Sequence, residues 1–482
     1  MAQKSIKKNY IYNLTFQILT LIIPLITTPY LSRVLGADGI GTFSYIESVS
    51  SYFVLFATLG LTIFGQREIS YVQDDRKKRS IIFWETCLLE LVATLLCIVA
   101  YIIFSLHQKN SDLYLVLVIN LISVIANISW FFQGLEEFGR IVLRNIIFKI
   151  LGVIYIFTFV TEKDDVIFYL FGVAFFALLN NLSYWTMLPK FIDKPSLKDL
   201  HPTRHLKTVF TLFAPTIAIS IYTVLDKTMI GLITDDAFEN GYYEQATKMS
   251  RVALTVVTSL GVVMIPRIGF MFSQKNTEAV RQSMYRSYRF VWLLGIPLTL
   301  GLIAVSQNFV PWFYGKGFEK VIPLLSVLSL LIIAIGINNV TGVQYLIPTR
   351  RQNTFTFTVI IGAIFNFLLN LFFIYYWKSI GAAIASVIAE TIIAVLQLII
   401  VRKELSSKEI LKCGIHYYLA GLVMFAVLLF IRDKFVPSVI NTAILVSIGA
   451  VVYFTVLIIQ KDDFLLSNFT KFSSKFFKRL DI

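Results

Sequence analysis

Charged residues are scarce in this chain, and their scarcity excludes an ordinary water-soluble protein. Only 15% of the 482 residues are Asp, Glu, Lys or Arg, whereas 57% are hydrophobic and the mean hydropathy is +0.74. Soluble domains usually carry about 25% charged residues. No polar half remains that could fold separately in water. The composition therefore predicts a membrane protein with many spanning helices.

Cysteine and histidine are also rare, which argues against disulfides and metal centres. Cys87, Cys97 and Cys413 lie in or beside apolar runs, and the four histidines show no metal-ligand spacing. A glycine-rich phosphate loop and a nucleotide-sugar motif are missing as well. We therefore expect no enzyme, no resident metal and no cofactor, apart from a sodium ion or a proton that couples to transport.

Long apolar runs dominate what is present. A helix needs about 20 apolar residues to cross a hydrocarbon core of about 30 Å. About 14 stretches meet this length. They lie near residues 10–32, 42–66, 81–106, 113–133, 141–160, 166–188, 208–233, 242–266, 287–307, 321–346, 355–377, 380–401, 414–431 and 439–460. The sequence thus predicts an all-α polytopic membrane protein with about 14 transmembrane helices.

The basic residues indicate the orientation of these helices. Lys and Arg are retained in cytoplasmic loops, and most of them fall on one side if both termini are cytoplasmic, as in the loop 189–207 and the tail 461–479. The same distribution accounts for the net charge of +14 without nucleic-acid binding. We expect a multi-pass protein of the plasma (inner) membrane with cytoplasmic N- and C-termini.

The loop 189–207, which contains Pro195 and Pro202, is the best internal boundary. It predicts a six-helix lobe at 1–195, a second six-helix lobe at 196–402, and two extra helices with a basic tail at 403–482. A faint repeat relates the lobes: Gly41 and Arg67 bracket one predicted helix, and Gly241 and Arg267 bracket another at the same spacing. Paired lobes of this kind are common in transporters, with the substrate site between them.

The predicted helices between Thr208 and Pro266 contain Asp226, Lys227, Glu244, Lys248 and Arg251. An ionised group at membrane depth costs about 2.5–3.5 kcal/mol even on a lenient scale. Such groups therefore usually face a watery or protein-lined interior and mark a pathway. A purely structural network is the alternative, because Glu244, Lys248 and Arg251 are spaced to share one helix face.

A second polar group lies further along the chain. Asn366 and Asn370 share one face of a predicted helix, and Ser386 and Glu390 share a face of the next. Oxygen-rich groups at this depth suit a hard cation such as sodium. Alternatively, these side chains only join neighbouring helices through hydrogen bonds.

Several segments of the chain are characteristic when taken together and in this order. They include SRVLGADGIGTFSYIES, LGLTIFGQREIS, WFFQGLEEFGRIVLRNIIFK, FYGKGFEKVIPLLSVLS, YLIPTRRQNTFTF and GAAIASVIAE, together with the stretch from Thr223 to Arg267. These segments resemble one known family, the polysaccharide-export branch of the multidrug/oligosaccharidyl-lipid/polysaccharide (MOP) exporter superfamily. The resemblance extends to about Val401. It implies two pseudo-symmetric six-helix lobes in a V-shaped, MATE-like arrangement, followed by two additional C-terminal helices.

The resemblance also implies a function. A Wzx-type flippase moves an oligosaccharide repeat unit on undecaprenyl diphosphate from the cytoplasmic to the outer leaflet by alternating access, for surface polysaccharide synthesis. Polysaccharide polymerase and chain-length proteins would be its partners. Alternatives are a lipid II-type flippase, a multidrug/cation antiporter of the same superfamily and, less favoured, a membrane polysaccharide polymerase or ligase.

The family also suggests roles for particular residues. An anionic diphosphate headgroup needs cations, and those within the predicted spans are Lys149, Lys227, Lys248 and Arg251. In related lipid II flippases a cation site corresponds by position to Asp226, Asn366, Asn370, the Ala382 carbonyl and Ser386. Asn370 stands where those relatives have a second acid, which lowers the local negative charge. A proton carried by Asp226 or Glu390 is therefore a rival to sodium.

Overall fold

The computed structural model describes residues 6–466, and the regular structure in that range is entirely helical. Side chains are not described at residues 6–19, 21, 138, 197, 214, 215, 218, 219, 221, 222 and 262. By its internal contacts the chain divides into two units, Met1–Gly241 and Tyr242–Ile482. The predicted boundaries after residues 195 and 402 stay predictions.

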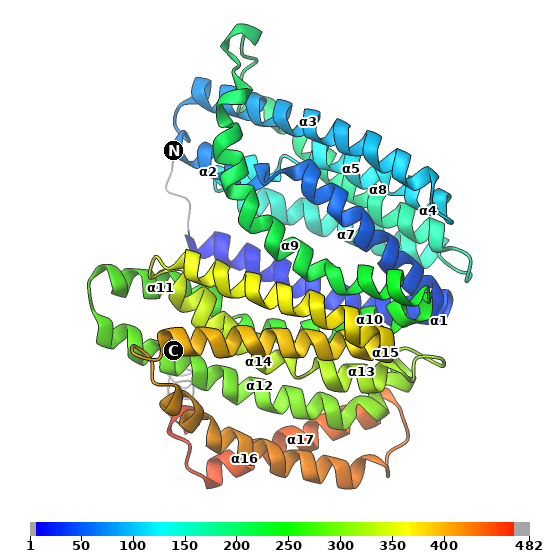
Figure 1. Cartoon of the computed structure of the whole chain (residues 1–482), viewed down its shortest axis with the longest axis vertical. Helices are drawn as coiled ribbons and strands as arrows, with labels where there is room; N and C mark the ends of the chain where they lie inside the picture. The colour runs from blue at the N-terminus through cyan, green and yellow to red at the C-terminus, as the bar shows by residue number, and fades with distance from the viewer. Residues whose placement is uncertain (1–5, 467–482) are drawn as a thin grey trace, which may run out of the picture. The chain divides into compact units, whose positions relative to one another are not determined.

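The first unit contains nine α-helices, of which the last is followed by the beginning of α10. The nine are α1 (Ile6–Thr58), α2 (Leu61–Tyr71), α3 (Arg76–Leu106), α4 (Ser111–Val116), α5 (Val118–Ala126), α6 (Ser129–Gly134), α7 (Phe138–Phe159), α8 (Val166–Trp185) and α9 (Leu206–Thr234). Within this unit α1 packs against α3, α7 and α9, and α8 packs against α5 and α7 (Figure 1). Short 3₁₀ turns, Leu188–Lys190, Leu197–Asp199 and Pro202–His205, lie between α8 and α9.

The second unit holds the rest of α10 and the helices that follow it. They are α10 (Ala237–Thr258), α11 (Gly261–Ser273), α12 (Thr277–Phe313), α13 (Val321–Leu328), α14 (Leu331–Asn338), the π-helix η4 (Asn339–Leu346), α15 (Gln352–Val401), α16 (Ser407–Arg432) and α17 (Val439–Ile459). The C-terminal helices α16 and α17 pack against α12 and against each other. They are therefore part of this unit's core.

The expected number of membrane crossings is confirmed. Eleven helical stretches in the described chain are long and apolar enough to span a membrane. Two of them, Ile22–Tyr71 and Gln352–Val401, are 50 residues long and turn at Gly36 (φ 69°) and Lys378 (φ 51°), so that each supplies two crossings. Helix α9, with 29 residues, adds one more. The result agrees with about 14 transmembrane helices, and a helix pairs most of its backbone polar groups internally, as a bilayer requires.

One boundary differs from the sequence prediction. Hydropathy places the start of the ninth span at residue 287, whereas α12 begins at Thr277. Asn276 caps its first turn, its side-chain oxygen accepting from the Ala279 N–H at 3.0 Å. Hydropathy detects only the segment surrounded by hydrocarbon, and this helix continues for about three turns beyond it.

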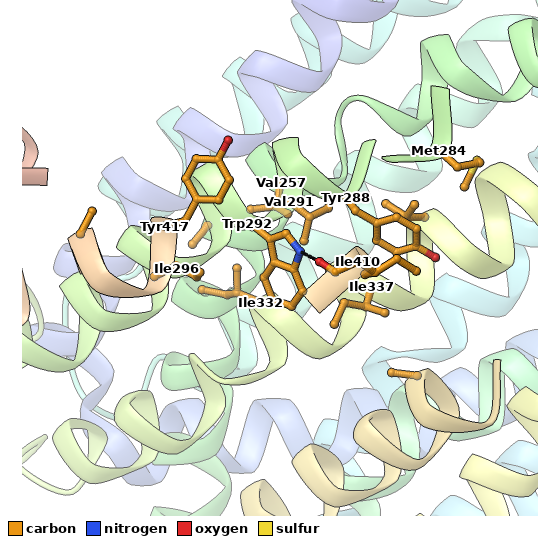
Figure 2. Close-up of a cluster of buried hydrophobic side chains, with 14 of the residues drawn as sticks. Val257, Met284, Tyr288, Val291, Trp292, Ile296, Ile332, Ile337, Ile410 and Tyr417 are labelled. Atoms are coloured by element: carbon orange, nitrogen blue, oxygen red, sulfur yellow. Dashed lines mark hydrogen bonds between the residues drawn. The ribbon is translucent and has the colours of Figure 1, made fainter. Parts of the chain in front are cut away.

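Helices α12, α14 and α16 meet in the hydrophobic core of the second unit (Figure 2). Trp292 on α12 is almost completely buried, and its indole N–H donates to the Ile410 carbonyl on α16 at 3.1 Å. Nearby, the Tyr288 hydroxyl lies 2.7 Å from the Thr341 hydroxyl. Large aromatic side chains bury much apolar area, and here the Trp292 N–H and the Tyr288 hydroxyl each keep a hydrogen-bond partner.

The segment between α8 and α9 is held against α3 by a buried carboxylate. Glu85 is fully buried and accepts from the His201 N–H at 2.7 Å and from Arg204 at 2.6 Å. The His205 ring nitrogen lies 2.8 Å from the same carboxylate. The segment between α8 and α9 is therefore anchored to α3.

The N-terminus of α3 is capped by Asp75. The Lys78 N–H donates to the Asp75 carboxylate, which lowers the pKa of that exposed carboxyl.

Two glycines of the sequence repeat meet within the first unit. A Cβ atom on Gly41 would lie 1.7 Å from the Ala237 carbonyl oxygen, and one on Gly241 would lie 1.9 Å from the Ala37 carbonyl oxygen. Both distances are far below any van der Waals contact. The contact is reciprocal, as a local two-fold relation between the segments 37–41 and 237–241 would produce.

We expect Gly41→Ala to destabilise the protein strongly, because the added methyl forces two backbones apart. Gly301→Ala is the matched control, since a Cβ there meets nothing within 4 Å. The control should be neutral or stabilising by about 0.5–1 kcal/mol, the usual gain for Ala over Gly in a helix. Thermal unfolding of the purified proteins in detergent distinguishes the two. Equal midpoints would contradict the close crossing.

Candidate functional site

Helices α9 and α10 carry the charged residues that the sequence places at membrane depth, and α9 ends at Thr234. Asp235 follows in the left-handed conformation (φ 46°), and its N–H donates to the Gly231 carbonyl. The Asp236 carboxylate then accepts from the Phe238 N–H at 3.1 Å as α10 begins. Asx turns of this kind favour a sharp reversal, so the acidic turn between α9 and α10 has a local physical cause.

Helix α10 carries the cations expected to contact an anionic ligand. Lys248 forms an ion pair with Glu244, one turn earlier, at 3.1 Å. The Glu244 side chain is 5% exposed and that of Lys248 is 34% exposed. Arg251 lies one turn further on, is exposed, and forms no ion pair within the described part of the chain. The structural pairing predicted by the spacing thus exists for Lys248, and the Arg251 guanidinium is left available.

The remaining predicted ligands belong to the first unit. The Lys149 ammonium on α7 donates to the Thr20 hydroxyl at 2.9 Å and is half-buried. Asp226 and Lys227 are adjacent, half-buried residues of α9. Close to them along the same helix, the Thr228 hydroxyl lies 2.9 Å from that of Ser48 on α1. Helix α9 is therefore fixed to α1 near these two charges. Their roles in binding or coupling stay predictions.

The second polar group converges as a chain of hydrogen bonds inside the second unit. Asn370 donates to the Asn366 side-chain oxygen at 3.1 Å, and Asn366 donates to the Ser386 hydroxyl at 3.4 Å. The Tyr243 hydroxyl on α10 lies 3.5 Å from that of Ser386. Both asparagines are completely buried. Residues from the two halves of α15 and from α10 therefore meet at one place.

Glu390 lies one turn beyond Ser386 and has a different partner. The Asn338 amide on α14 donates both to the Glu390 backbone carbonyl, at 3.1 Å, and to its carboxylate. Ala382, whose carbonyl was a predicted ligand, is fully buried one turn before Ser386. Asn338 and Tyr243 were not predicted from the sequence. An asparagine at the end of the apolar run 331–338 was the available signal for Asn338, and no signal indicated Tyr243.

This donor set decides what kind of ion it could hold. Asn366, Asn370, Ser386 and Tyr243 offer neutral oxygens of the type that hard cations prefer. The hydrogen-bonded chain of these four contains no carboxylate, and Asn366 already uses its oxygen to accept from Asn370. Across the described residues, no group of three or more His, Cys, Asp or Glu is arranged for a metal ion. The set suits a weakly held monovalent cation better than a tightly bound divalent one.

Comparison with known proteins now identifies the family. The family described as polysaccharide biosynthesis protein matches residues 6–272, more than half of the chain. The chain belongs to this family. This match confirms the resemblance to polysaccharide-export proteins that the sequence segments indicated.

Two curated relatives are similar over most of their length. A protein of Escherichia coli K12 that carries the name of an O-antigen transporter is 23% identical over 406 residues, which is 83% of this chain and 97% of the relative. The teichuronic acid biosynthesis protein TuaB of Bacillus subtilis is 22% identical over 425 residues, covering 84% and 86% of the two chains. The family likeness therefore extends beyond the residues matched by the family itself.

Solved structures agree with this fold. The lipid II flippase MurJ in its inward closed conformation superposes with a TM-score of 0.76 at 17% identity, covering 95% of this chain and all of that one. An inward-facing multidrug resistance MATE family transporter of the MOP superfamily reaches 0.57 at 13% identity, covering 85% and 98%. At these identities the likeness concerns the fold alone.

Asn366→Ala should destabilise this protein measurably, because it removes hydrogen bonds from two buried partners, Asn370 and Ser386. A loss of about 1–3 kcal/mol is expected. Thr391→Ala on the same helix is the control, since that exposed hydroxyl bonds only to the Val387 carbonyl of its own helix. Thermal unfolding in detergent measures both. If the two variants melted together, Asn366 would not be joining the two halves of α15.

Proposed function

We propose that this protein is a flippase for lipid-linked oligosaccharide repeat units, moving them from the cytoplasmic to the outer leaflet by alternating access. The cargo would be an oligosaccharide on undecaprenyl diphosphate, used for surface polysaccharide synthesis. Membership of the polysaccharide biosynthesis family over residues 6–272 carries the proposal. The names of the two relatives, one concerned with O-antigen and one with teichuronic acid, support the same class of cargo.

The charges on α10 supply a physical reason. A sugar diphosphate headgroup is polar and anionic and cannot cross hydrocarbon alone, whereas its polyprenyl tail can remain in lipid. Arg251 lies in the candidate span Ala237–Ser273 without an ion-pair partner among the described residues. A guanidinium binds phosphate oxygens in a bidentate manner. We assign Arg251 the main contact with the diphosphate, with Lys149, Lys227 and Lys248 as secondary contacts.

The orientation belongs to the same proposal. Most Lys and Arg residues fall on one side of the predicted spans, which supports cytoplasmic N- and C-termini in the plasma (inner) membrane. The cargo would then be received from enzymes that complete it on the cytoplasmic face. It would be delivered to a polymerase and its chain-length proteins on the other face.

Disrupting the gene should cause complete repeat units on undecaprenyl diphosphate to accumulate, as measured by mass spectrometry of extracted lipids. The wild-type gene should relieve the accumulation, and Arg251→Gln should restore at most about a tenth of export, since charged contacts contribute about 1.5–3 kcal/mol. Lys316→Gln is the control, because Lys316 is an exposed cation in the loop before α13. Normal export by Arg251→Gln at equal protein levels would contradict the assigned contact.

The identity of the accumulated lipid separates the alternatives. The superposition on MurJ favours a lipid II-type flippase as the second candidate, because all of that chain is covered. Accumulation of lipid II instead of repeat units would support that candidate. Accumulation of neither would favour a multidrug/cation antiporter, and exported but unpolymerised repeat units would indicate a polymerase or ligase.

We further propose that transport is coupled to a monovalent cation. Sodium would use the neutral oxygens of Asn366, Asn370 and Ser386, with the Ala382 carbonyl, whereas a proton would use Asp226 or Glu390. The hydrogen-bonded chain of Asn370, Asn366 and Ser386 in α15 supports the sodium assignment. The contact between Asn338 and the Glu390 carboxylate supports the proton assignment. Sodium would have to displace the amide hydrogen bonds, while a proton would only neutralise a carboxylate.

Export rates under separate gradients test this coupling. If sodium drives transport, replacing sodium by potassium should slow wild-type export by about tenfold, and Ser386→Ala should remove the sodium dependence. If protons drive it, an uncoupler should slow export, while Glu390→Gln or Asp226→Asn should be inactive or insensitive to the uncoupler. Thr391→Ala serves as the control on the same helix. Wild-type export that responds to neither gradient would rule out cation coupling.

A further inference from the structure

A cavity of about 540 Å³ that is lined mainly by charged and polar residues lies in the second unit, where α12 and α16 begin and α17 has just ended. Helix α12 contributes Gln282, Tyr285, Arg286 and Arg289 to its wall. These positions follow the i, i+3, i+4, i+7 pattern, so the four side chains form one stripe along the helix. Two guanidinium groups and two hydrogen-bonding groups therefore line the same face.

Helix α16 presents a second stripe with the same spacing. Glu409, Lys412, Cys413 and His416 line the cavity. The stripes lie against each other because α12 and α16 pack along their length. The Trp292 indole bond to the Ile410 carbonyl holds the two helices together beside the cavity. The Ser406 N–H also donates to the Tyr285 hydroxyl at 3.0 Å. The walls are thus part of the packed unit.

Charge in this cavity is unbalanced. Three cations, Arg286, Arg289 and Lys412, face two carboxylates, Glu409 and Asp462. None of the three cations forms an ion pair with a carboxylate within the described chain. One Asp462 oxygen already accepts from the Tyr417 hydroxyl at 3.2 Å and from the Leu465 N–H at 2.8 Å. The cavity therefore retains a net positive charge and a surplus of N–H donors.

The chemistry of these groups fits a phosphate. Guanidinium groups match phosphate oxygens in a bidentate manner, and a lysine adds a third charge-assisted hydrogen bond. Gln282 and His416 can supply further donors, or acceptors for a hydroxyl group attached to the phosphate. A sodium ion or an apolar ligand would not match this lining.

Two observations favour a membrane lipid as the source of such a phosphate. The cavity lies at the ends of three helices that are long and apolar enough to span a membrane, Thr277–Phe313, Ser407–Arg432 and Val439–Ile459. Next to it, α16 exposes large apolar side chains along its length, including Leu411, Ile415, Leu419 and Leu422. An acyl chain can follow these side chains while its headgroup occupies the cavity.

We propose that this cavity binds the phosphate headgroup of an anionic lipid, at a site separate from the one proposed for transported cargo. On the predicted topology it faces the cytoplasmic leaflet, where basic pockets between spanning helices bind anionic headgroups. All residues of this site belong to the second unit, and lipid binding there does not depend on the flippase function. A bound lipid would bridge α12 and α16 and would stabilise that unit.

Cys413 provides a reporter inside the cavity. The full-length chain with Cys87→Ser and Cys97→Ser retains Cys413 as its single thiol. It is placed in nanodiscs of phosphatidylcholine, of phosphatidylcholine with phosphatidylglycerol, or of phosphatidylcholine with inorganic phosphate in the buffer. Alkylation by N-ethylmaleimide is followed by intact mass. Phosphatidylglycerol should slow alkylation about tenfold, and inorganic phosphate should not.

Matched charge removals provide the controls. In R286Q/R289Q/K412Q phosphatidylglycerol should no longer slow the reaction. In R402Q/K403Q/K408Q, which removes the same charge from exposed positions at the same end of the unit, the slowing should persist. Slowing that survives in the cavity variant would reflect surface potential alone and would overturn the proposal. Slowing by inorganic phosphate would instead indicate a soluble phosphate ligand.

If R286Q/R289Q/K412Q does not fold, the proposal can still be tested on the protein with the unmutated cavity. The unmutated cavity is then judged by its three nanodisc conditions and by thermal unfolding in detergent with added phosphatidylglycerol or phosphatidylcholine. Selective protection of Cys413 together with a raised midpoint in phosphatidylglycerol supports the site. Equal alkylation rates in all three conditions contradict it.

Discussion

The cost of placing polar groups in hydrocarbon governs most of this structure. Every backbone N–H and C=O in the spans must find a partner within the protein, which permits only helices in a chain without a closed barrel. The same cost explains why charged side chains inside the spans are few and why many have partners. Glu85 accepts hydrogen bonds from the segment between α8 and α9. Lys248 pairs with Glu244, and Lys149 donates a hydrogen bond to Thr20. Arg251 differs from these three, because its guanidinium forms no ion pair or side-chain hydrogen bond within the described part of the chain.

The second unit contains two kinds of polar arrangement, and the free-energy cost of placing polar groups in hydrocarbon differs between them. The Asn370–Asn366–Ser386 chain is neutral, so it can remain fully buried when nothing is bound. The cavity between α12 and α16 is charged, and it is located at the helix ends where water and lipid headgroups can reach it. The buried asparagine chain therefore carries no charge, whereas the cavity at the helix ends holds three cations and two carboxylates.

Local pattern predicted much of this structure, and long-range packing accounts for what it missed. The apolar runs predicted the spans, and four-residue spacing predicted the Glu244–Lys248 pair, because both depend on neighbours along one helix. Tyr243 and Asn338 escaped notice because they meet Ser386 and Glu390 only after distant helices pack. Likewise, Arg286 and Lys412 were not predicted to belong to any site. Their shared cavity depends on contacts between α12 and α16 that sequence spacing cannot reveal.

The crossing of Gly41 and Gly241 has a consequence for how the two segments can diverge. Each glycine makes room for a carbonyl group of the other segment, so a side chain at either position displaces the same pair of backbones. Substitutions elsewhere in the segments can be compensated when neighbouring side chains repack. A side chain at Gly41 or Gly241 meets the backbone itself, which no smaller neighbouring residue can relieve. If the segments descend from one duplicated ancestor, these two positions would keep their original residue after most neighbours had changed. An otherwise faint repeat would then remain visible mainly where its two copies touch.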